Sequence, residues 1–454
     1  MPTVDADLPF NGTPEEFSAQ IFGAAEPWPA GDAGAQGLEL RPFRGVRFAP
    51  EAVGDLAAVT TPPYDLIDAG EVERLLASDG HNVVRLILPP GDADGYRRAA
   101  ATLRRWLAEG VLIADEVPAL YIYEVHAGDG LHQRGLIGAL GLRPESAGVI
   151  LPHEDVFPGP VRDRLALMSA TGANLEPIFL VYDGEAAAPR RTSDLVEAIA
   201  DRTAPLVEFH GRDGTRHRLW RVTDPAVQER LAAGLRECRA LIADGHHRYA
   251  TYRALQARHR AAGDGPGPWD YGLALLVDSA RHPPRLGAIH RVLPGLAPET
   301  AVERAKAAFR VTELQDGLQE AVKELATRRP AFLLGGGERL YLLTDPDARH
   351  LAQAMPAGRS ERWRRLDTAV LDRLLIARLW GITADERTVR VVHDDPEAAI
   401  EQARRAGGTA VIVNPLSVAD VLAVAAGGER VPRKSTSFAP KPRTGLVLRL
   451  LDLD

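Results

Sequence analysis

The alternation of apolar and polar positions along this chain predicts both strands and helices. Residues 119–142 predict two strands joined by a turn at Gly128-Asp129-Gly130, a sequence typical of a hairpin. Residues 271–278 and 83–88 are apolar runs of strand length, whereas residues 95–109 repeat apolar positions at helical spacing. Because helices and strands alternate in this way towards the C-terminus as well, the pattern predicts a mixed α/β fold.

Shifts in composition divide the chain into four predicted parts. Residues 1–38 contain acidic but no basic side chains, and their Gly, Ala and Pro content predicts an acidic, mostly disordered arm. Residues 39–145 are expected to form an N-terminal α/β region and residues 146–262 a central core. A Gly/Pro-rich linker then opens a C-terminal α/β region, residues 263–454.

The composition argues against several classes of protein. The net charge of -8 over 454 residues argues against nucleic-acid binding, which requires a basic surface. Cys238 is the only cysteine, so no internal disulfide can form, and the reducing cytoplasm is the expected compartment. No apolar run approaches the roughly 20 residues of a membrane helix, and no signal peptide is recognisable. We expect a cytoplasmic protein without nucleic-acid or membrane partners, whose oligomeric state the sequence leaves open.

The sequence Asp244-Gly245-His246-His247-Arg248 is the strongest functional signal. It joins an apolar run, residues 240–243, to a helix-like segment, residues 249–260. A glycine turn that opens a helix presents free backbone N–H groups at the positive helix end, where phosphate binds. Arg248 adds a planar guanidinium that suits phosphate oxygens, and histidines can donate hydrogen bonds, transfer protons or bind metal. The alternative is an Asp-Gly turn with polar surface side chains.

Two further clusters are candidates for the same site. His153, Glu154 and Asp155 follow an apolar segment, where a carboxylate can act as a general base or hold magnesium, or can simply be solvated. The basic segment at residues 430–441 contains two of the four lysines of the chain. Its Lys434-Ser435-Thr436 predicts a phosphate contact, with a basic surface loop as the alternative.

Two shorter sequences are candidates for a substrate pocket, together with His153. His290-Arg291 lies in a predicted strand and could face the pocket, although a structural histidine is the alternative. Thr61-Pro62-Pro63-Tyr64-Asp65 is extended and rigid, because each proline also restricts the residue before it. It predicts one wall of a cleft, with Tyr64 in the pocket.

Five short sequences, taken in order, resemble a widespread bacterial and archaeal family catalogued as domain of unknown function number ten-fifteen. They are Leu40-Arg41-Pro42-Phe43-Arg44, Pro62-Pro63-Tyr64-Asp65, Leu151-Pro152-His153-Glu154, Ala243-Asp244-Gly245-His246-His247-Arg248-Tyr249-Ala250 and Pro432-Arg433-Lys434-Ser435-Thr436. The resemblance runs from about residue 38 to the end of the chain.

The central part also resembles the ParB/sulfiredoxin-like nucleotide-binding fold, and within it the free L-serine kinases. These share the D-G-H-H-R turn and an upstream glutamate. The resemblance implies a ParB/sulfiredoxin-like core at residues 146–262 with large flanking α/β regions. It also implies Glu154 as the catalytic carboxylate, with Asp244 and His247 assisting. The turn Gly245-His246-His247-Arg248 would bind phosphate, and Asp244 would hold magnesium.

Functions of different classes remain open at this point. The first is a kinase that uses ATP or ADP with Mg²⁺ to phosphorylate a small hydroxy amino acid, free L-serine being the leading acceptor. The second is a nucleotide-binding switch or scaffold that binds CTP or ATP without phosphoryl transfer. A third is a tailoring enzyme that activates a hydroxy amino acid. A carboxylate placed for base catalysis favours the kinase, because a switch needs none.

Overall fold

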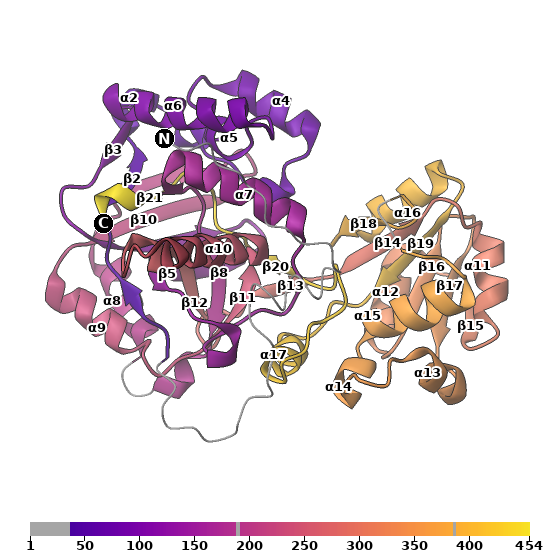
Figure 1. The fold of residues 1–454 in the computed structure, drawn as a ribbon. Helices are drawn as coiled ribbons and strands as arrows, with labels where there is room; N and C mark the ends of the chain where they lie inside the picture. Colours follow the sequence, from indigo (N-terminus) through magenta and orange to yellow (C-terminus); the bar gives the residue numbers. More distant parts are fainter. Residues whose placement is uncertain (1–36, 188–190, 385–386) are drawn as a thin grey trace. The chain divides into compact units, whose positions relative to one another are not determined.

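The protein consists of two compact units, one inserted into the other. The computed structural model describes residues 37–187, 191–384 and 387–454. Of the described residues, unit 1 contains those up to Pro284 and also Pro440–Asp454, whereas unit 2 contains those of Arg285–Ala439 (Figure 1). The arm predicted at residues 1–38 lies outside the described residues, apart from its last two.

Unit 1 is built on a nine-stranded sheet. In spatial order its strands are β6 (Ile150–Leu151), β11 (Ala240–Asp244), β8 (Ile178–Tyr182), β12 (Tyr271–Asp278), β5 (His132–Gly141), β4 (Leu120–His126), β10 (Arg216–Val222) and β9 (Val207–His210), with β1 (Leu40–Arg41) also paired to β5. Only the pairs β6–β11 and β8–β12 are parallel in this sheet. Strands from both sides of residues 145 and 262 share this sheet, and the predicted division of the chain into four parts stays a prediction.

Four helices pack their apolar faces onto this sheet and complete its core. They are α7 (Pro158–Thr171), α8 (Thr192–Arg202), α9 (Pro225–Ala233) and α10 (His246–Ala262). Figure 1 shows α10 lying across the sheet with α7 beside it. Glycines with a positive φ bound α10, Gly245 at 91° and Gly263 at 81°, because few other residues adopt this conformation at a helix end.

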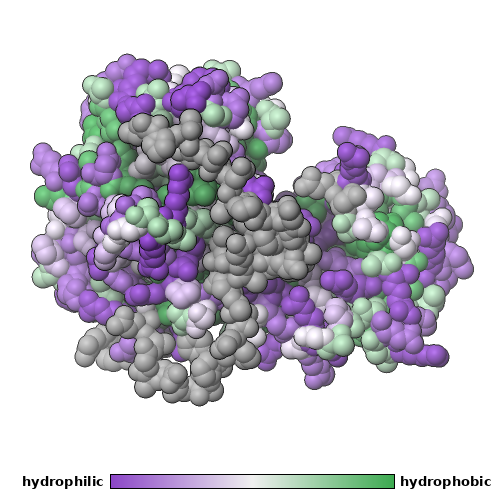
Figure 2. All heavy atoms as spheres, viewed as in Figure 1, coloured by the Kyte–Doolittle hydropathy of each residue, from purple (hydrophilic) through white to green (hydrophobic). Residues whose placement is uncertain are grey.

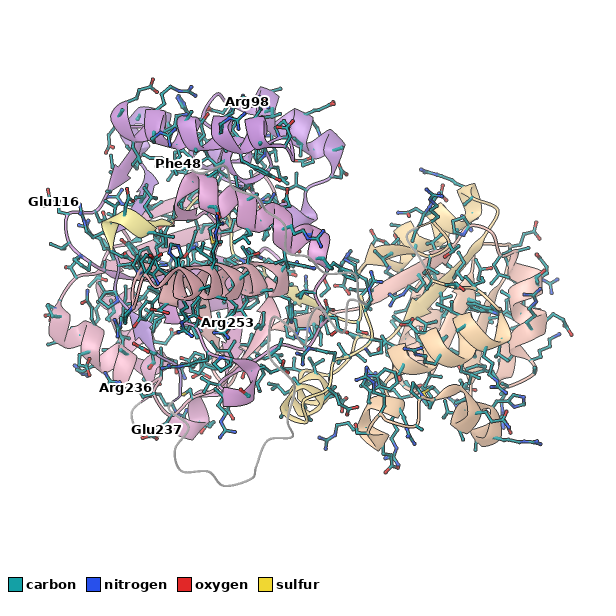
Figure 3. All side chains as sticks on the ribbon, in the orientation of Figure 1. Phe48, Arg98, Glu116, Arg236, Glu237 and Arg253 are labelled. Atoms are coloured by element: carbon teal, nitrogen blue, oxygen red, sulfur yellow. The ribbon has the colours of Figure 1, made fainter. Side chains whose placement is uncertain are left out.

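A second core of unit 1 lies between a smaller sheet and the helices of the N-terminal part. The sheet order is β3 (Leu112–Ala114), β2 (Gly45–Phe48), β21 (Leu448–Leu450) and β7 (Ala173–Asn174), and the helices are α2 (Pro50–Val53), α3 (Leu56–Val59), α4 (Ala69–Ser78), α5 (Val84–Ile87) and α6 (Ala93–Ala108). Phe48 packs on Trp106 with ring centroids 5.8 Å apart, whereas Arg98 points outwards from α6 (Figure 3). The strand predicted at residues 83–88 is instead the helix α5.

Unit 2 is built on a six-stranded antiparallel sheet with its own core. The sheet order is β15 (Arg310–Leu314), β17 (Leu340–Thr344), β16 (Phe332–Gly335), β19 (Thr409–Val413), β14 (Ile289–Leu293) and β18 (Arg390–His393). Its helices are α11 (Pro298–Ala305), α12 (Leu318–Ala326), α13 (Ala348–Ala354), α14 (Glu361–Arg364), α15 (Asp367–Val370), α16 (Pro396–Arg405) and α17 (Val418–Ala426), and a π-helix, Leu371–Leu379, continues α15. Both units combine helices and sheets, which confirms the predicted mixed α/β class.

The chain enters and leaves unit 2 through one pair of short strands. β13 (Arg285–Gly287) and β20 (Ser437–Ala439) pair antiparallel, with Arg285 opposite Ala439. The visible outer faces of both units are predominantly hydrophilic (Figure 2). Within the described ranges, no helix combines the length and apolar character that crossing a membrane demands.

Candidate functional site

Two loops that carry candidate residues meet at one edge of the nine-stranded sheet. Because β6 runs parallel to β11, with Ile150 opposite Ala240, the carboxyl ends of both strands lie at the same edge. The backbone N–H of His153 donates to Nε2 of His246 over 3.2 Å, and the two rings lie 4.5 Å apart. The loop that contains Glu154 is therefore joined to the turn that contains Asp244, although about 90 residues separate them in the sequence.

The second histidine of the turn contacts the start of α7. The backbone N–H of Phe157, just before α7, donates to Nε2 of His247 over 3.1 Å. Since both His246 and His247 accept a hydrogen bond at Nε2, each neutral ring carries its proton on Nδ1. His246 is buried and His247 is half-buried. The roles expected of these histidines in phosphate binding and catalysis stay predictions.

Gly245 shapes the turn between β11 and α10. A Cβ atom at this position would lie 3.1 Å from both Nε of Arg248 and Cγ2 of Ile178, and its φ is 91°. Only glycine meets both conditions without strain. Gly245 occupies the N-cap position of α10 and has no side chain that could cap the helix, so the partial positive charge of this long helix is directed at the edge where the two loops meet.

Arg248 is buried and bonded to the protein itself. Its Nη1 donates to the carbonyl of Pro177 over 2.6 Å and its Nη2 to Oδ2 of Asp244 over 2.5 Å, with 4% of the residue exposed. Burial lowers the pKa of Arg248, but Glu176 and Asp244 outweigh this effect and raise it. Nε has no hydrogen-bond partner in the described residues. In this structure Arg248 orders the turn, and the phosphate contact expected of it stays a prediction.

Lys441 is the second cation on Asp244. Its Nζ lies 2.5 Å from Oδ1 of Asp244 and 3.1 Å from Oδ2 of Asp65. Burial and the nearby Asp65 raise the pKa of Asp244, although Lys441 and Arg248 oppose the shift. Partial burial also tends to raise the pKa of Asp65, but the charges of Lys441 and Arg248 leave it lowered. A network of alternating charges therefore closes the end of β11.

This network does not fit the magnesium ion expected at Asp244. Both oxygens of that carboxylate are already occupied, Oδ1 by the ammonium of Lys441 and Oδ2 by the guanidinium of Arg248. A divalent cation there would be repelled by both. Across the described ranges, no cluster of three or more His, Cys, Asp or Glu side chains is arranged as a metal site. The metal assignment of Asp244 is therefore not supported by its surroundings.

A buried carboxylate, Glu176, links Tyr64 to the same network. Its Oε1 accepts hydrogen bonds from the backbone N–H of Tyr64 and the hydroxyl of Thr444, each over 3.0 Å. Burial raises the pKa of Glu176, with Arg248 and Arg164 opposing. The Tyr64 ring lies beneath two guanidinium groups, 4.6 Å from Arg164 and 5.9 Å from Arg248. Tyr64 thus lies beside the turn, and its role as a pocket residue stays a prediction.

The remaining predicted site residues belong to unit 2. His290 is buried, its Nδ1 accepts the N–H of Val413 over 3.3 Å, and burial lowers its pKa to about 4. Arg291 donates to the carbonyl of Lys434 over 3.0 Å, and the hydroxyl of Ser435 donates to the carbonyl of Pro432 over 2.5 Å. These bonds order the segment. The phosphate contacts expected of Lys434, Ser435 and Thr436, and the pocket role expected of Arg291, stay predictions.

Sequence reasoning missed Lys441, Asp65 and Glu176 as members of the site. A signal existed for the first two. Lys441 is one of only four lysines and closes the basic segment at residues 430–441, and Asp65 directly follows Tyr64 in the rigid proline sequence. Glu176 gave no such signal, because a single glutamate before an apolar run is common at a strand start.

The fold and site define a mixed α/β protein with a glycine turn and a buried charge network at a sheet edge. The chain belongs to the family described as Protein of unknown function (DUF1015), whose model matches residues 40–369. This confirms the family expected from the short ordered sequences. No protein of curated function is similar enough to match.

Comparison with solved structures finds several chains of weak similarity to this one. A free serine kinase in complex with AMP is 16% identical, with a TM-score of 0.33, and the match covers 67% of this chain and 90% of that one. SbnI with C-terminal truncation, from Staphylococcus aureus, is 12% identical, with a TM-score of 0.33 and coverages of 66% and 84%. A conserved hypothetical protein from Pyrococcus furiosus is 15% identical, with a TM-score of 0.31 and coverages of 67% and 94%. Likeness at this level carries no argument about activity, and the ParB/sulfiredoxin-like core stays a prediction.

Proposed function

We propose that this protein binds a nucleotide at the start of α10 and transfers its terminal phosphoryl group to a small hydroxy amino acid. Free L-serine is the first acceptor to test, and ATP or ADP the first donor. The observation that carries the proposal is the parallel pairing of β6 with β11, which brings the loop of Glu154 to the turn at Asp244. A carboxylate beside an anion-binding helix end is what phosphoryl transfer to a hydroxyl requires.

In the proposed reaction Glu154 accepts the proton of the acceptor hydroxyl. The hydroxyl oxygen forms a bond to the terminal phosphorus, and the bond from phosphorus to the bridging oxygen breaks. The products are the phosphorylated amino acid and ADP from ATP, or AMP from ADP. The N-terminus of α10 and the cations of the network offset the negative charge on the phosphates, so positioning and electrostatics provide most of the acceleration.

Asp244 contributes to this mechanism by holding the side chains of Arg248 and Lys441 in position. Its carboxylate is held by Arg248 and Lys441, so it is not available as a second base or as a magnesium ligand. Mg²⁺ is supplied in the assay together with the nucleotide, and no step depends on a metal bound to Asp244.

The ion pair between Asp244 and Arg248 favours a second candidate function. Because these two side chains are engaged with each other, the site also suits a nucleotide-binding switch that performs no chemistry. The two candidates differ in one measurable product, the phosphorylated acceptor. A switch would bind CTP or ATP and form none.

The test is an assay of phosphoryl transfer with matched variants. The wild-type protein is incubated with ATP or ADP, Mg²⁺ and a panel of hydroxy amino acids, and phosphorylated product is measured by mass spectrometry. Glu154→Gln should retain nucleotide affinity but lose about two to four powers of ten in rate, the usual range for general-base catalysis. Glu303→Gln makes the same change at an exposed glutamate of unit 2 and should keep the rate. Nucleotide binding without any phosphorylated product would replace the kinase with the switch.

A further inference from the structure

The network at the end of β11 contains one cation that can change partners. Lys441 Nζ contacts Asp244 Oδ1 at 2.5 Å and Asp65 Oδ2 at 3.1 Å. An ammonium has three N–H donors. These two carboxylates are its acceptors in the described residues, so a third acceptor can still be bound.

The exposure of the side chains shows which contact can be exchanged. The side chain of Asp65 is 40% exposed, whereas that of Asp244 is 10% exposed and that of Lys441 14%. Water can take over the solvation of Asp65 when the lysine leaves it, so breaking this contact costs little. Arg248 offers no such freedom, because both of its terminal nitrogens are bonded to buried acceptors.

The backbone on both sides of Lys441 is anchored. The carbonyl of Pro440 accepts from Nε2 of Gln133 over 3.2 Å, and Thr444 exchanges backbone hydrogen bonds with Thr61 of 2.8 and 3.1 Å. Nε of Arg443 also donates to Oγ1 of Thr60 over 2.6 Å. The ammonium can therefore change partners by rotation within its side chain while the segment stays in place.

We propose that Lys441 contacts the terminal phosphate of the bound nucleotide, and that Asp65 is the carboxylate it leaves when the phosphate arrives. Asp244 keeps its contact throughout and holds the lysine at the start of α10. The proposal rests on the proposed function, because it requires a polyphosphate ligand at this end of the helix.

The first experiment compares ATP with adenosine by calorimetric titration. Lys441→Met should raise the Kd for ATP by about ten- to a hundredfold, the value of one hydrogen bond to a charged group, and leave the Kd for adenosine unchanged. Lys441→Arg should recover part of the loss. Lys323→Met is the matched control, since Lys323 is an exposed lysine paired with Glu320 in unit 2 and should bind ATP as the wild type does.

The second experiment tests the exchange of partners. Asp65→Asn frees Lys441 from one carboxylate and should lower the Kd for ATP by about two- to fivefold, in the range of one exposed ion pair. In the Lys441→Met background the same change should have no effect, so the double-mutant cycle measures the coupling. Thermal melting of each variant verifies folding, and Lys441→Gln replaces Lys441→Met if the latter does not fold.

Three outcomes separate this proposal from the proposed function. Equal losses for ATP and adenosine in Lys441→Met would mean that the lysine only supports the structure, and would overturn the proposal. Unchanged ATP binding would overturn it while leaving nucleotide binding intact. If wild-type protein binds none of ATP, ADP, CTP, GTP and inorganic tripolyphosphate, the proposed function fails and this proposal fails with it. If CTP or GTP binds in place of ATP, that nucleotide and its nucleoside serve as the probes.

Discussion

Arg248 connects three elements of unit 1 through one guanidinium. It lies in the first turn of α10, donates to Asp244 at the end of β11, and donates to Pro177 directly before β8. Both acceptors are buried, so water cannot replace the arginine as their hydrogen-bond donor if the arginine is lost. The side chain that looks most like a phosphate ligand in the sequence is therefore also a structural centre of the sheet edge.

We expect Arg248→Ala to lower the free energy of unfolding by about 3 kcal/mol or more, because the carbonyl of Pro177 and Oδ2 of Asp244 would both lose their buried charged donor. Arg248→Lys should recover part of this, since one ammonium cannot reproduce the fork that serves both acceptors. Urea denaturation measures both values. Arg258→Ala, on an exposed part of the same helix, should cost about 0.5 kcal/mol or less. Equal costs for the two alanine variants would contradict this account.

The sequence predicts the turn at residues 244–248 because its signal is local. A strand, a glycine and a helix start follow one another within a few residues, and each has its own pattern. The contact of Lys441 with Asp244 depends instead on where the chain returns to unit 1 after unit 2. No spacing rule covers such a contact, which is why Lys434 is the lysine that the sequence favours.

At the scale of elements, short apolar runs are where prediction and structure differ. The hairpin of β4 and β5 was predictable from its alternation and its glycine turn. Residues 83–88 have the same apolar character but form α5, because Oδ1 of Asn82 accepts the N–H of Val84 over 2.9 Å and starts a helical turn. Periodicity alone cannot distinguish a buried helical turn from a buried strand.

The helical stretch formed by α15 and the π-helix begins at Asp367, a carboxyl group with a raised pKa. Asp367 is 3% exposed and its Oδ2 accepts from Nη1 of Arg329 over 3.2 Å. Burial raises the pKa of Asp367 to about 6, and Arg329 opposes the shift. A carboxyl whose pKa rises on folding stabilises the fold in its protonated form.

The contribution of Asp367 to stability is therefore complete below about pH 4 and is lost as the pH rises through about 6. Asp367→Asn should remove this loss. Between pH 4 and pH 7 the free energy of unfolding of the wild type should therefore fall by about 2 kcal/mol relative to that of the variant. Urea unfolding at a series of pH values measures the difference. Parallel stability curves for the two proteins would show that Asp367 does not titrate in this way.

At the scale of the whole molecule, each unit has a core of its own. The two cores of unit 1 contain only residues before Pro284 or after Pro440, and the core of unit 2 contains only residues between them. The family model matches residues 40–369, which include parts of both units. The composition of the linker at residues 263–268 predicts a domain boundary there. An inserted unit has two boundaries, here before residue 285 and after residue 439, and neither has a comparable signal in the sequence.

A chain that lacks residues 285–439 should therefore fold. Since Arg285 and Ala439 are opposite each other, their Cα atoms lie about 5 Å apart and about three glycine or serine residues can join Pro284 to Pro440. Circular dichroism should show one cooperative unfolding transition, and Lys441 should still pair with Asp244. An unfolded product would mean that unit 1 needs unit 2 for its assembly.

The pairing of β13 with β20 gives unit 2 the same connectivity as the turn of a hairpin. Two antiparallel strands with one uninterrupted chain between them are the definition of a hairpin, and here the whole of unit 2 occupies the place of its turn. Turns tolerate changes in length at small cost, because the entropy of closing a loop grows only with the logarithm of its length. Homologues could therefore enlarge, replace or omit this turn while the end of β11 stays the same.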